Sequence, residues 1–464
     1  MAEEKNEKLN LKSVTYDVVS ENLRGLVRAG VPVFRKNIEG QLVTIPVEKL
    51  EHFLGETARD IELFIEDNWQ GKVSARNRER RPLAANAGSA LARAMELYGN
   101  TEEQVGRFQT CSVAEREEIL DGSIESLHAL QKSNSDFDIE AIIKMVEVIA
   151  NTFYANYANL EDNLSTENVR ENILGVFIKT EWIVKMLIEF FRVNNSDKNF
   201  LLIEKIDTGS YTITNMCKAL LWFIGFGLYY NNYIDKGLFT KNIRGNFKEK
   251  LLRYYRRRLP DINISVETVV RGGFRRIDTE KDLVQYAVGA LLYDIGKIPF
   301  IAYHDGNDAY DPEIVRLHVL TGYNMLLKTK SHSFPVTAMA AFHHEYYGGK
   351  RSYNFSAPVM GKLTGKKYDF QNADYFMTYD ENEFKNGRVL SFFPCKVIEI
   401  IDVFLALTGR KKMSNIEAFK MMKTEFVTKN TQLDPLLLEI FIDFAVSCGM
   451  FGSAERGEID AIKF

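Results

Sequence analysis

The stretch Tyr286-Ala-Val-Gly-Ala-Leu-Leu-Tyr-Asp-Ile-Gly-Lys-Ile-Pro299 places one acid, Asp294, in a segment that is otherwise mostly apolar. The residues from Asp282 to Ile298 are predicted to form an apolar helix. A carboxylate in such surroundings is costly unless it pairs with a cation or coordinates a metal. Lys297 lies three residues on and on the same side, so one interpretation of Asp294 is an ordinary ion pair. The other is a metal ligand.

A second acid stands in an equally apolar segment, Val397-Ile-Glu-Ile-Ile-Asp-Val-Phe-Leu-Ala-Leu-Thr408. This acid, Asp402, is either a solvent-facing residue at a helix edge or a ligand in the same site as Asp294. Five of the seven histidines fall between His304 and His344. Neutral imidazole is a good ligand for ions such as iron, zinc and manganese. Two acids in apolar surroundings and a cluster of histidines together favour a shared metal site.

The adjacent pair His343-His344, followed by Glu345, ends the apolar stretch Val336 to Phe342. Neighbouring side chains leave a helix about 100° apart. The pair can therefore bind two metals, or one metal and a substrate phosphate. Three other histidines are interpreted as ordinary surface or core residues: His52, His128 and His332.

Four segments, in this order, resemble signatures of the HD-GYP subclass of HD-domain phosphohydrolases. Asp294-Ile-Gly-Lys-Ile298 is similar to the signature H-D-I-G-K-I, and His318 with Gly322 four residues later is similar to H-P-x-x-G. His343-His344-Glu345 matches H-H-E, and Ile400-Ile-Asp-Val-Phe-Leu-Ala-Leu-Thr408 resembles A-D-V-Y-D-A-L-T. The resemblance covers residues 205–455 approximately.

The resemblance implies a helical bundle that binds divalent metals, with iron or manganese as the expected ions. It implies five metal ligands: Asp294, His318, His343, His344 and Asp402. It assigns Lys297 a catalytic role beside the scissile phosphate, whereas the ordinary interpretation of Lys297 is a surface charge past a helix end. The implied reaction is hydrolysis of a phosphodiester, and the family's usual substrate is cyclic di-GMP.

Three departures from the family pattern bear on activity. Tyr293 stands where the signature histidine is expected, and a phenol stays protonated near neutral pH unless a metal lowers its pKa. Asn215, in Tyr211-Thr-Ile-Thr-Asn-Met, aligns with an earlier family histidine. The segment D-G-x-G-Y-P appears as Gly348-Gly-Lys-Arg-Ser-Tyr353, in which only Gly349 survives. One metal position is therefore expected to bind weakly, so that the site holds one or two ions.

Two functions from different classes stay open on the sequence. The first is a metal-dependent phosphodiesterase, weakened by these departures, with cyclic di-GMP as the first candidate substrate. The second is a catalytically inactive pseudoenzyme that senses a nucleotide or binds a protein and needs no metal. A third and weaker hypothesis is hydrolysis of another phosphate compound, such as a nucleotide monophosphate.

The composition is that of a soluble globular protein, with 45% hydrophobic and 26% charged residues and a formal net charge of −4. At 464 residues, two or three domains are expected. The near-balanced charge gives no reason to propose nucleic acid as a partner. The four cysteines form no CxxC pair, which argues against a disulfide framework or a cysteine zinc site. A polar N-terminus and the shortness of the apolar run Ala219 to Tyr230 predict a cytoplasmic protein without a membrane span.

The chain is predicted to be mainly α, with three regions. Residues 1–75 form a small α+β module, in which Val31 to Lys36 and Gln41 to Val47 make a hairpin that leads into a helix ending at Leu54. Residues 76–204 form a helical region with a regulatory or docking role. Its predicted helices are Pro82 to Tyr98, Val113 to Gln131, Ile139 to Leu160 and Asn168 to Val193. A protein partner, if there is one, is expected to bind through residues 1–200.

Residues 205–464 form the HD-GYP-like domain, a helical bundle with two insertions. Apolar helices are predicted at Tyr211 to Tyr233 and Lys396 to Thr408. The insertion near 241–281 carries twelve bases against five acids and is interpreted as a solvated face, in preference to a phosphate-binding surface. The insertion near 346–390 is rich in Gly, Asn, Asp and Tyr and is predicted to be long and irregular.

Overall fold

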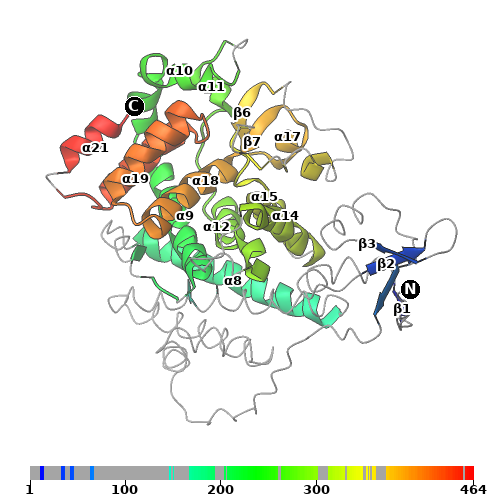
Figure 1. Ribbon diagram of the computed structural model, residues 1–464. Helices are drawn as coiled ribbons and strands as arrows, with labels where there is room; N and C mark the ends of the chain where they lie inside the picture. Colours follow the sequence, from blue (N-terminus) through cyan, green and yellow to red (C-terminus); the bar gives the residue numbers. More distant parts are fainter. Residues whose placement is uncertain are drawn as a thin grey trace, which may run out of the picture. The chain divides into compact units, whose positions relative to one another are not determined.

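The computed structural model of the chain describes residues 11–14, 33–36, 42–45, 63–66, 146–147, 150, 167–193, 203–204, 206–208, 210–259, 263–300, 312–329, 332–347, 352–353, 355, 358–361, 373–452 and 455–464. The chain divides into two units, Met1–Asn86 and Ala87–Phe464 (Figure 1). The predicted division at residues 75 and 204 stays a prediction. The helices predicted at 47–54, 82–98 and 113–131, and most of the one at 139–160, lie outside the described residues.

The described part of the first unit is a four-stranded antiparallel sheet. Its strands are β1 Leu11–Val14, β2 Val33–Lys36, β3 Leu42–Ile45 and β4 Leu63–Glu66, in the order β1-β4-β2-β3. Strands β2 and β3 pair with Val33 opposite Ile45, and both of these side chains are buried. The predicted hairpin is therefore confirmed, whereas the sequence did not indicate β1 and β4.

The described part of the second unit is mostly helical, as predicted. Its elements in chain order are α8 Glu167–Val193, α9 Tyr211–Asp235, η3 Phe239–Arg244, η4 Phe247–Leu251, α10 Leu252–Tyr255, α11 Val266–Val269, β5 Val270–Arg271, α12 Asp282–Leu292, η5 Ile295–Phe300, α14 Pro312–Thr329, α15 Phe334–Phe342, β6 Tyr375–Thr378, α17 Glu381–Lys385, β7 Val389–Phe392, α18 Phe393–Leu405, η7 Ala406–Arg410, α19 Asn415–Met421, η8 Met422–Lys429, α20 Pro435–Ser447 and α21 Arg456–Ile462. None of the helices described has both the length and the apolar character that crossing a membrane requires.

Helix α9 lies at the centre of this unit and packs against α8, α12, α18 and α20 (Figure 1). Ser210 caps its start, because the Ser210 hydroxyl oxygen accepts a hydrogen bond from the amide of Ile213 at 3.3 Å. The indole of Trp222 meets the rings of Phe404 on α18 and Phe441 on α20 edge-on, at 5.7 and 5.8 Å. Burying large aromatic faces of this kind is a major source of stability. The predicted helix from 211 to 233 is confirmed.

Helix α18 also matches its prediction, since every one of its residues is buried. Its polar residues are satisfied inside the protein: the Lys396 ammonium lies 2.7 Å from a carboxylate oxygen of Glu399, and neither side chain is exposed. The helix continues through η7, so the predicted range of 396–408 is covered. Asp402 is held on this rigid element.

The predicted helix from Asp282 to Ile298 ends early, at Leu292. The chain turns at residues 293 and 294 and continues as the 3-10 helix η5. Pro299 disfavours an α conformation in the residue before it. At Gly296 a Cβ atom would lie 1.9 Å from the carbonyl oxygen of His318 and 2.4 Å from the amide nitrogen of Gly322. Glycine therefore lets η5 touch the backbone of α14, which brings Asp294 beside His318.

The irregular structure predicted for residues 346–390 is wrong for the C-terminal part of that range. Strand β6, helix α17 and the start of β7 lie there. Strands β5, β6 and β7 form a parallel sheet in that order, with Val270 opposite Met377 and Tyr375 opposite Val389. Strands this short show no alternating pattern of polar and apolar residues. Because polar residues surround them, the sequence predicted irregular structure instead of a sheet.

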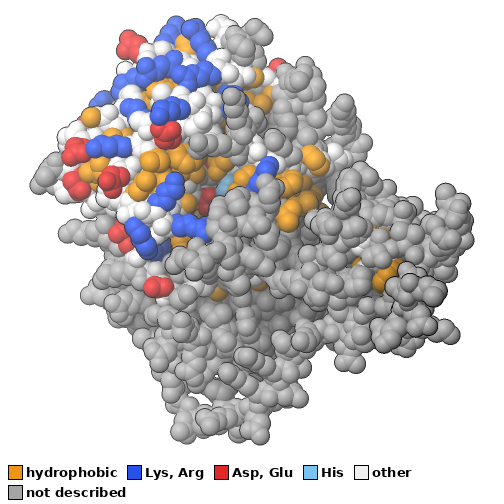
Figure 2. Space-filling model, viewed as in Figure 1, with side chains coloured by type: hydrophobic (Ala, Val, Ile, Leu, Met, Phe, Trp, Pro, Cys, Tyr) orange, Lys and Arg blue, Asp and Glu red, His pale blue; other side chains and the backbone are white. Residues whose placement is uncertain are grey.

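The basic segment 241–281 is more than the solvated face that was predicted. Figure 2 shows Lys and Arg side chains gathered on the surface over α10 and α11. However, Phe247, Leu251 and Tyr255 of the same segment are buried in the core. Arg257 donates to the carbonyl oxygen of Thr428, and Arg258 donates to that of Thr431 at 3.1 Å. These arginines satisfy carbonyl groups at the end of η8, as cations commonly do at helix C-termini.

Candidate metal centre

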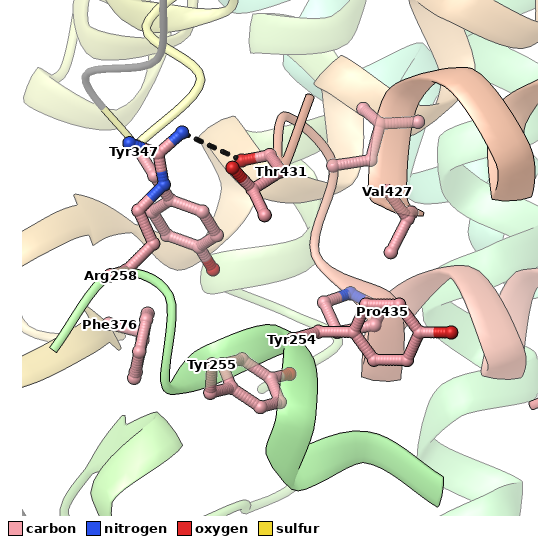
Figure 3. A pocket seen from close by; sticks show the side chains of 9 residues that line it. Tyr254, Tyr255, Arg258, Tyr347, Phe376, Val427, Thr431 and Pro435 are labelled. Carbon is pink, nitrogen blue, oxygen red and sulfur yellow. Dashed lines mark hydrogen bonds between the residues drawn. The ribbon is translucent and has the colours of Figure 1, made fainter. Parts of the chain in front are cut away.

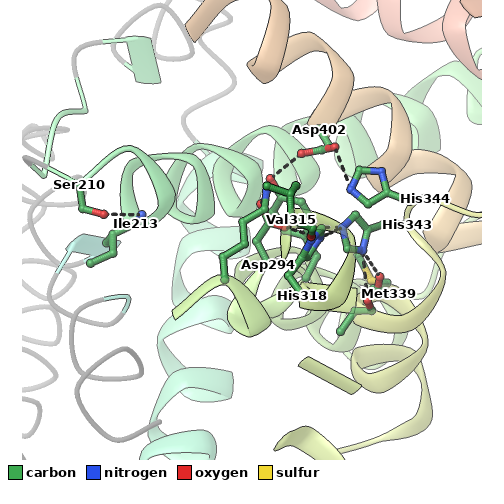
Figure 4. A network of polar contacts seen from close by, with 12 residues as sticks. Ser210, Ile213, Asp294, Val315, His318, Met339, His343, His344 and Asp402 are labelled. Carbon is green, nitrogen blue, oxygen red and sulfur yellow. Dashed lines mark hydrogen bonds and ion pairs between the residues drawn. The ribbon is translucent and has the colours of Figure 1, made fainter. Parts of the chain in front are cut away.

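Three buried histidines converge on one point between two helices. His318 lies in α14, His343 ends α15, and His344 follows it. One ligand atom from each histidine lies within 4.8 Å of those of the other two. The Nε2 atoms of His318 and His343 are 3.1 Å apart. Figure 4 shows these rings together with Asp294 and Asp402, so the structure brings together all five residues that the sequence singled out as ligands.

Backbone carbonyl groups decide which nitrogen carries the proton in two of these rings. Nδ1 of His318 contacts the carbonyl oxygen of Val315, and Nδ1 of His343 lies 3.0 Å from that of Met339. A carbonyl oxygen only accepts, so each Nδ1 is the protonated atom and each neutral ring keeps a lone pair on Nε2. Burial lowers the pKa of His318 to about 4, so that this ring is neutral at pH 7. The Nε2 atoms of the two rings face the same point, 3.1 Å apart.

Asp294 adds a carboxylate oxygen to the same point. Its Oδ1 lies 3.2 Å from Nε2 of His318 and 3.6 Å from Nε2 of His343. This oxygen is buried and has no hydrogen-bond partner. Burial alone would raise the pKa of Asp294, but the Lys297 ammonium on its other oxygen and the imidazoles of His318 and His343 together outweigh burial and hold that pKa well below its usual range. A buried anionic oxygen beside two nitrogen lone pairs is a donor set that fits a divalent cation.

Asp402 lies on the other side of the histidines. The Tyr293 hydroxyl donates to Oδ1 of Asp402 at 3.0 Å, and Oδ2 lies 4.0 Å from Nε2 of His344. Burial raises the pKa of Tyr293 well above its usual value, and the nearby carboxylates of Asp294 and Asp402 raise it further. Tyr293 is therefore a neutral hydrogen-bond donor. The alternative of a solvent-facing Asp402 is wrong, because the residue is buried.

One side of the centre reaches solvent. The side chains of His344 and Asp402 are each 11% exposed and that of Lys297 is 14% exposed, whereas His318 is fully buried. Figure 2 shows a histidine and an acidic side chain at the surface on the face in view.

Several contacts of the centre were not predicted. The Nδ1 atom of His344 lies 2.9 Å from the hydroxyl of Tyr346, and the ring of Tyr353 lies 4.4 Å from that of His344. The guanidinium of Arg316 lies 5.5 Å from the centre of the Tyr353 ring. The tyrosines that follow His343-His344 in sequence were a signal for these contacts, but backbone carbonyl partners leave no signal in a sequence.

Asn215, which aligns with a family histidine, lies on α9 and is buried. A Cβ atom on Gly409 would lie 3.9 Å from its side-chain oxygen and 3.3 Å from the ring of Tyr211. Burial raises the pKa of Tyr211, and Lys297 and Asp402 also act on it. Position 215 therefore lies near the Asp402 side of the centre and offers an amide there.

A separate pocket lies at the end of the basic segment (Figure 3). Aromatic rings, one arginine and several apolar side chains line it: Tyr254, Tyr255, Arg258, Tyr347, Phe376, Val427, Thr431, Leu433 and Pro435. The hydroxyls of Tyr255 and Tyr347 both donate to Asp434, at 3.0 and 2.7 Å, which fixes two of its walls. None of the lining residues belongs to the metal centre.

His332 lies outside the histidine cluster and provides a pH test. Burial lowers its pKa to about 3. At a pH below about 6.5, the ordinary pKa of histidine, His332 of the unfolded chain binds a proton, whereas His332 of the folded protein stays neutral. The free energy of unfolding should therefore fall by about 1.4 kcal/mol per pH unit as the pH drops from 6.5 towards 3.

The measurement is urea unfolding of the wild type and of His332→Gln between pH 7 and pH 5. The wild type should lose about 2 kcal/mol more than the variant over this range. Parallel pH curves for the two proteins would contradict the lowered pKa.

Comparisons with known proteins add little. No family model and no curated protein matches the chain. Among solved structures the chain is similar to "Bd1817, a HDG"Y"P protein from Bdellovibrio bacteriovorus", with a TM-score of 0.39 and 11% sequence identity over 94% of this chain and 100% of that chain. A TM-score this low carries no argument, so the interpretation of the centre depends on its own geometry.

Proposed function

We propose that residues 205–464 form a metal-dependent phosphohydrolase domain of the HD-GYP type, which hydrolyses a phosphodiester. One observation carries this proposal: two imidazole nitrogens and a carboxylate oxygen meet at a buried point. These atoms belong to His318, His343 and Asp294. Mixed imidazole and carboxylate ligands suit iron or manganese. His344 and Asp402 complete the set on the exposed side.

A divalent ion in such a centre acts as a Lewis acid towards a phosphoester and makes water a better nucleophile. The protein's own residues supply the rest of the chemistry. Lys297, held by Asp294, offers a fixed positive charge that offsets negative charge developing on the phosphoryl oxygens. Tyr293 donates to Asp402 and so fixes the orientation of that carboxylate.

The first candidate substrate is cyclic di-GMP, on the strength of the four family segments. Turnover is expected to be slow because the segment from Gly348 to Tyr353 lacks the family's GYP triplet. The test loads anaerobically purified protein with iron or manganese and measures release of product from cyclic di-GMP and from a model phosphodiester. Metal-stripped protein should be inactive. Protein that carries stoichiometric metal yet turns over neither compound with any common divalent ion would refute hydrolysis.

A second candidate is a catalytically inactive domain that binds a nucleotide, or a protein through residues 1–200. The pairing of Asp294 with Lys297 and of Asp402 with Tyr293 favours it, since both carboxylates already have a partner. In that case calorimetry should detect binding of cyclic di-GMP without turnover. Absence of both binding and turnover would leave a protein-binding role, to be tested by deleting residues 1–200 in cells.

A further inference from the structure

We propose that Lys297 is a built-in cation that takes the place of a second metal, so that the centre holds one divalent ion. This inference rests on the proposed metal centre and concerns how many ions that centre accepts. The sequence led us to expect one or two ions, and the inference is that the centre holds one.

The two oxygens of Asp294 face different groups. Oδ1 faces the His318 and His343 nitrogens, where it lacks a hydrogen-bond partner, and Oδ2 is paired with the Lys297 ammonium. A carboxylate that bridges two metals with one oxygen on each metal needs both of its oxygens. In this protein the second oxygen is committed to Lys297.

The position of Lys297 follows from the backbone. The amide of Lys297 donates to the carbonyl oxygen of Asp294 at 2.8 Å, which closes a tight turn at the start of η5. In 3-10 geometry the side chains of residues i and i+3 lie above one another. The ammonium is therefore brought over Asp294 by the local fold, and its side chain is only 14% exposed.

The carboxylate of Asp402 also has a partner for one of its oxygens. Oδ1 of Asp402 accepts a hydrogen bond from the Tyr293 hydroxyl at 3.0 Å. The Tyr293 ring stands edge-on to His343, with ring centres 5.0 Å apart and planes at 85°. This packing holds the hydroxyl where a metal-ligating imidazole was expected. A second ion bound through these two oxygens would have to displace the Lys297 ammonium and the hydrogen bond from Tyr293.

The test is a manganese titration of the metal-free protein, read by elemental analysis and by electron paramagnetic resonance. The wild type should bind one equivalent with the spectrum of an isolated ion. Lys297→Met should bind two, with the spectrum of a coupled pair. Lys297→Arg keeps the charge and should stay at one. Lys429→Met removes a lysine from an ion pair away from the centre, that with Glu425 at the surface, and should also stay at one.

Each outcome is decisive. Two equivalents in the wild type would overturn the inference but leave the proposed function standing, whereas no binding at all would overturn the proposed function itself. One equivalent in Lys297→Met would overturn the inference alone. If circular dichroism shows that Lys297→Met is unfolded, Lys297→Gln keeps a hydrogen-bond donor for Asp294 without the charge. The same gain of one equivalent is then expected of Lys297→Gln, and its absence counts against the inference.

Discussion

Replacing His343 by alanine is expected to remove the metal from the protein while leaving the helical fold in place. Nε2 of His343 lies 3.1 Å from Nε2 of His318 and 3.6 Å from Oδ1 of Asp294, so it contributes directly to the point where the ligand atoms meet. Loss of a residue that merely supports a ligand costs about 10- to 100-fold in metal affinity. Loss of His343 should therefore cost more than about 100-fold.

The measurement is elemental analysis after anaerobic purification, followed by competition with a chelator of known affinity. His332→Gln is the control, because His332 lies outside the cluster and should leave metal content unchanged. Far-UV circular dichroism checks the helices of both variants. If His343→Ala retains its metal at wild-type affinity, His343 is not a ligand and the proposed centre is wrong.

The second large effect is expected from Gly296→Ala. The added Cβ would lie 1.9 Å from the carbonyl oxygen of His318 and 2.4 Å from the amide nitrogen of Gly322. Both neighbours are backbone atoms, which cannot swing aside as the end of a side chain can. Overpacking commonly costs about 1–3 kcal/mol, and a backbone clash of this depth should reach about 3 kcal/mol or more. Metal affinity should fall too, because η5 carries Asp294 away from His318 when it shifts.

Gly457→Ala provides the matched control. Gly457 lies in helix α21, and a Cβ atom there would meet no other atom within 4 Å. Alanine should be neutral or stabilise the helix by about 0.5–1 kcal/mol. Urea unfolding and metal titration of both variants make the comparison. A Gly296→Ala protein as stable as the wild type would show that η5 and α14 are not in contact.

The sequence predicts elements whose pattern is local. Continuous apolar runs indicated α9 and α18, and β-prone runs on either side of a turn indicated β2 and β3. The parallel sheet of β5, β6 and β7 was missed because its pairings join residues far apart, such as Val270 and Met377. The early end of α12 depends on the contact of Gly296 with α14, which no local pattern records.

The residues of the centre were easier to predict than their pairings. Asp294, His318 and His343 stand out by residue type in apolar surroundings, and the structure brings them together. The sequence also offered an ion pair with Lys297 as the alternative to a metal ligand for Asp294. In the structure each interpretation corresponds to one oxygen of Asp294. One oxygen faces the imidazoles and the other pairs with Lys297.

The packing of α9 against α20 has a consequence for the order in which the protein is made. The ribosome completes the apolar helix containing Trp222 long before it reaches Phe441 and Phe444, whose rings cover that indole. A translating chain therefore carries an uncovered aromatic surface until nearly its last helix emerges. Exposed apolar surface of this kind promotes aggregation during synthesis. A nascent chain stalled before residue 435 should depend on chaperones that bind apolar segments.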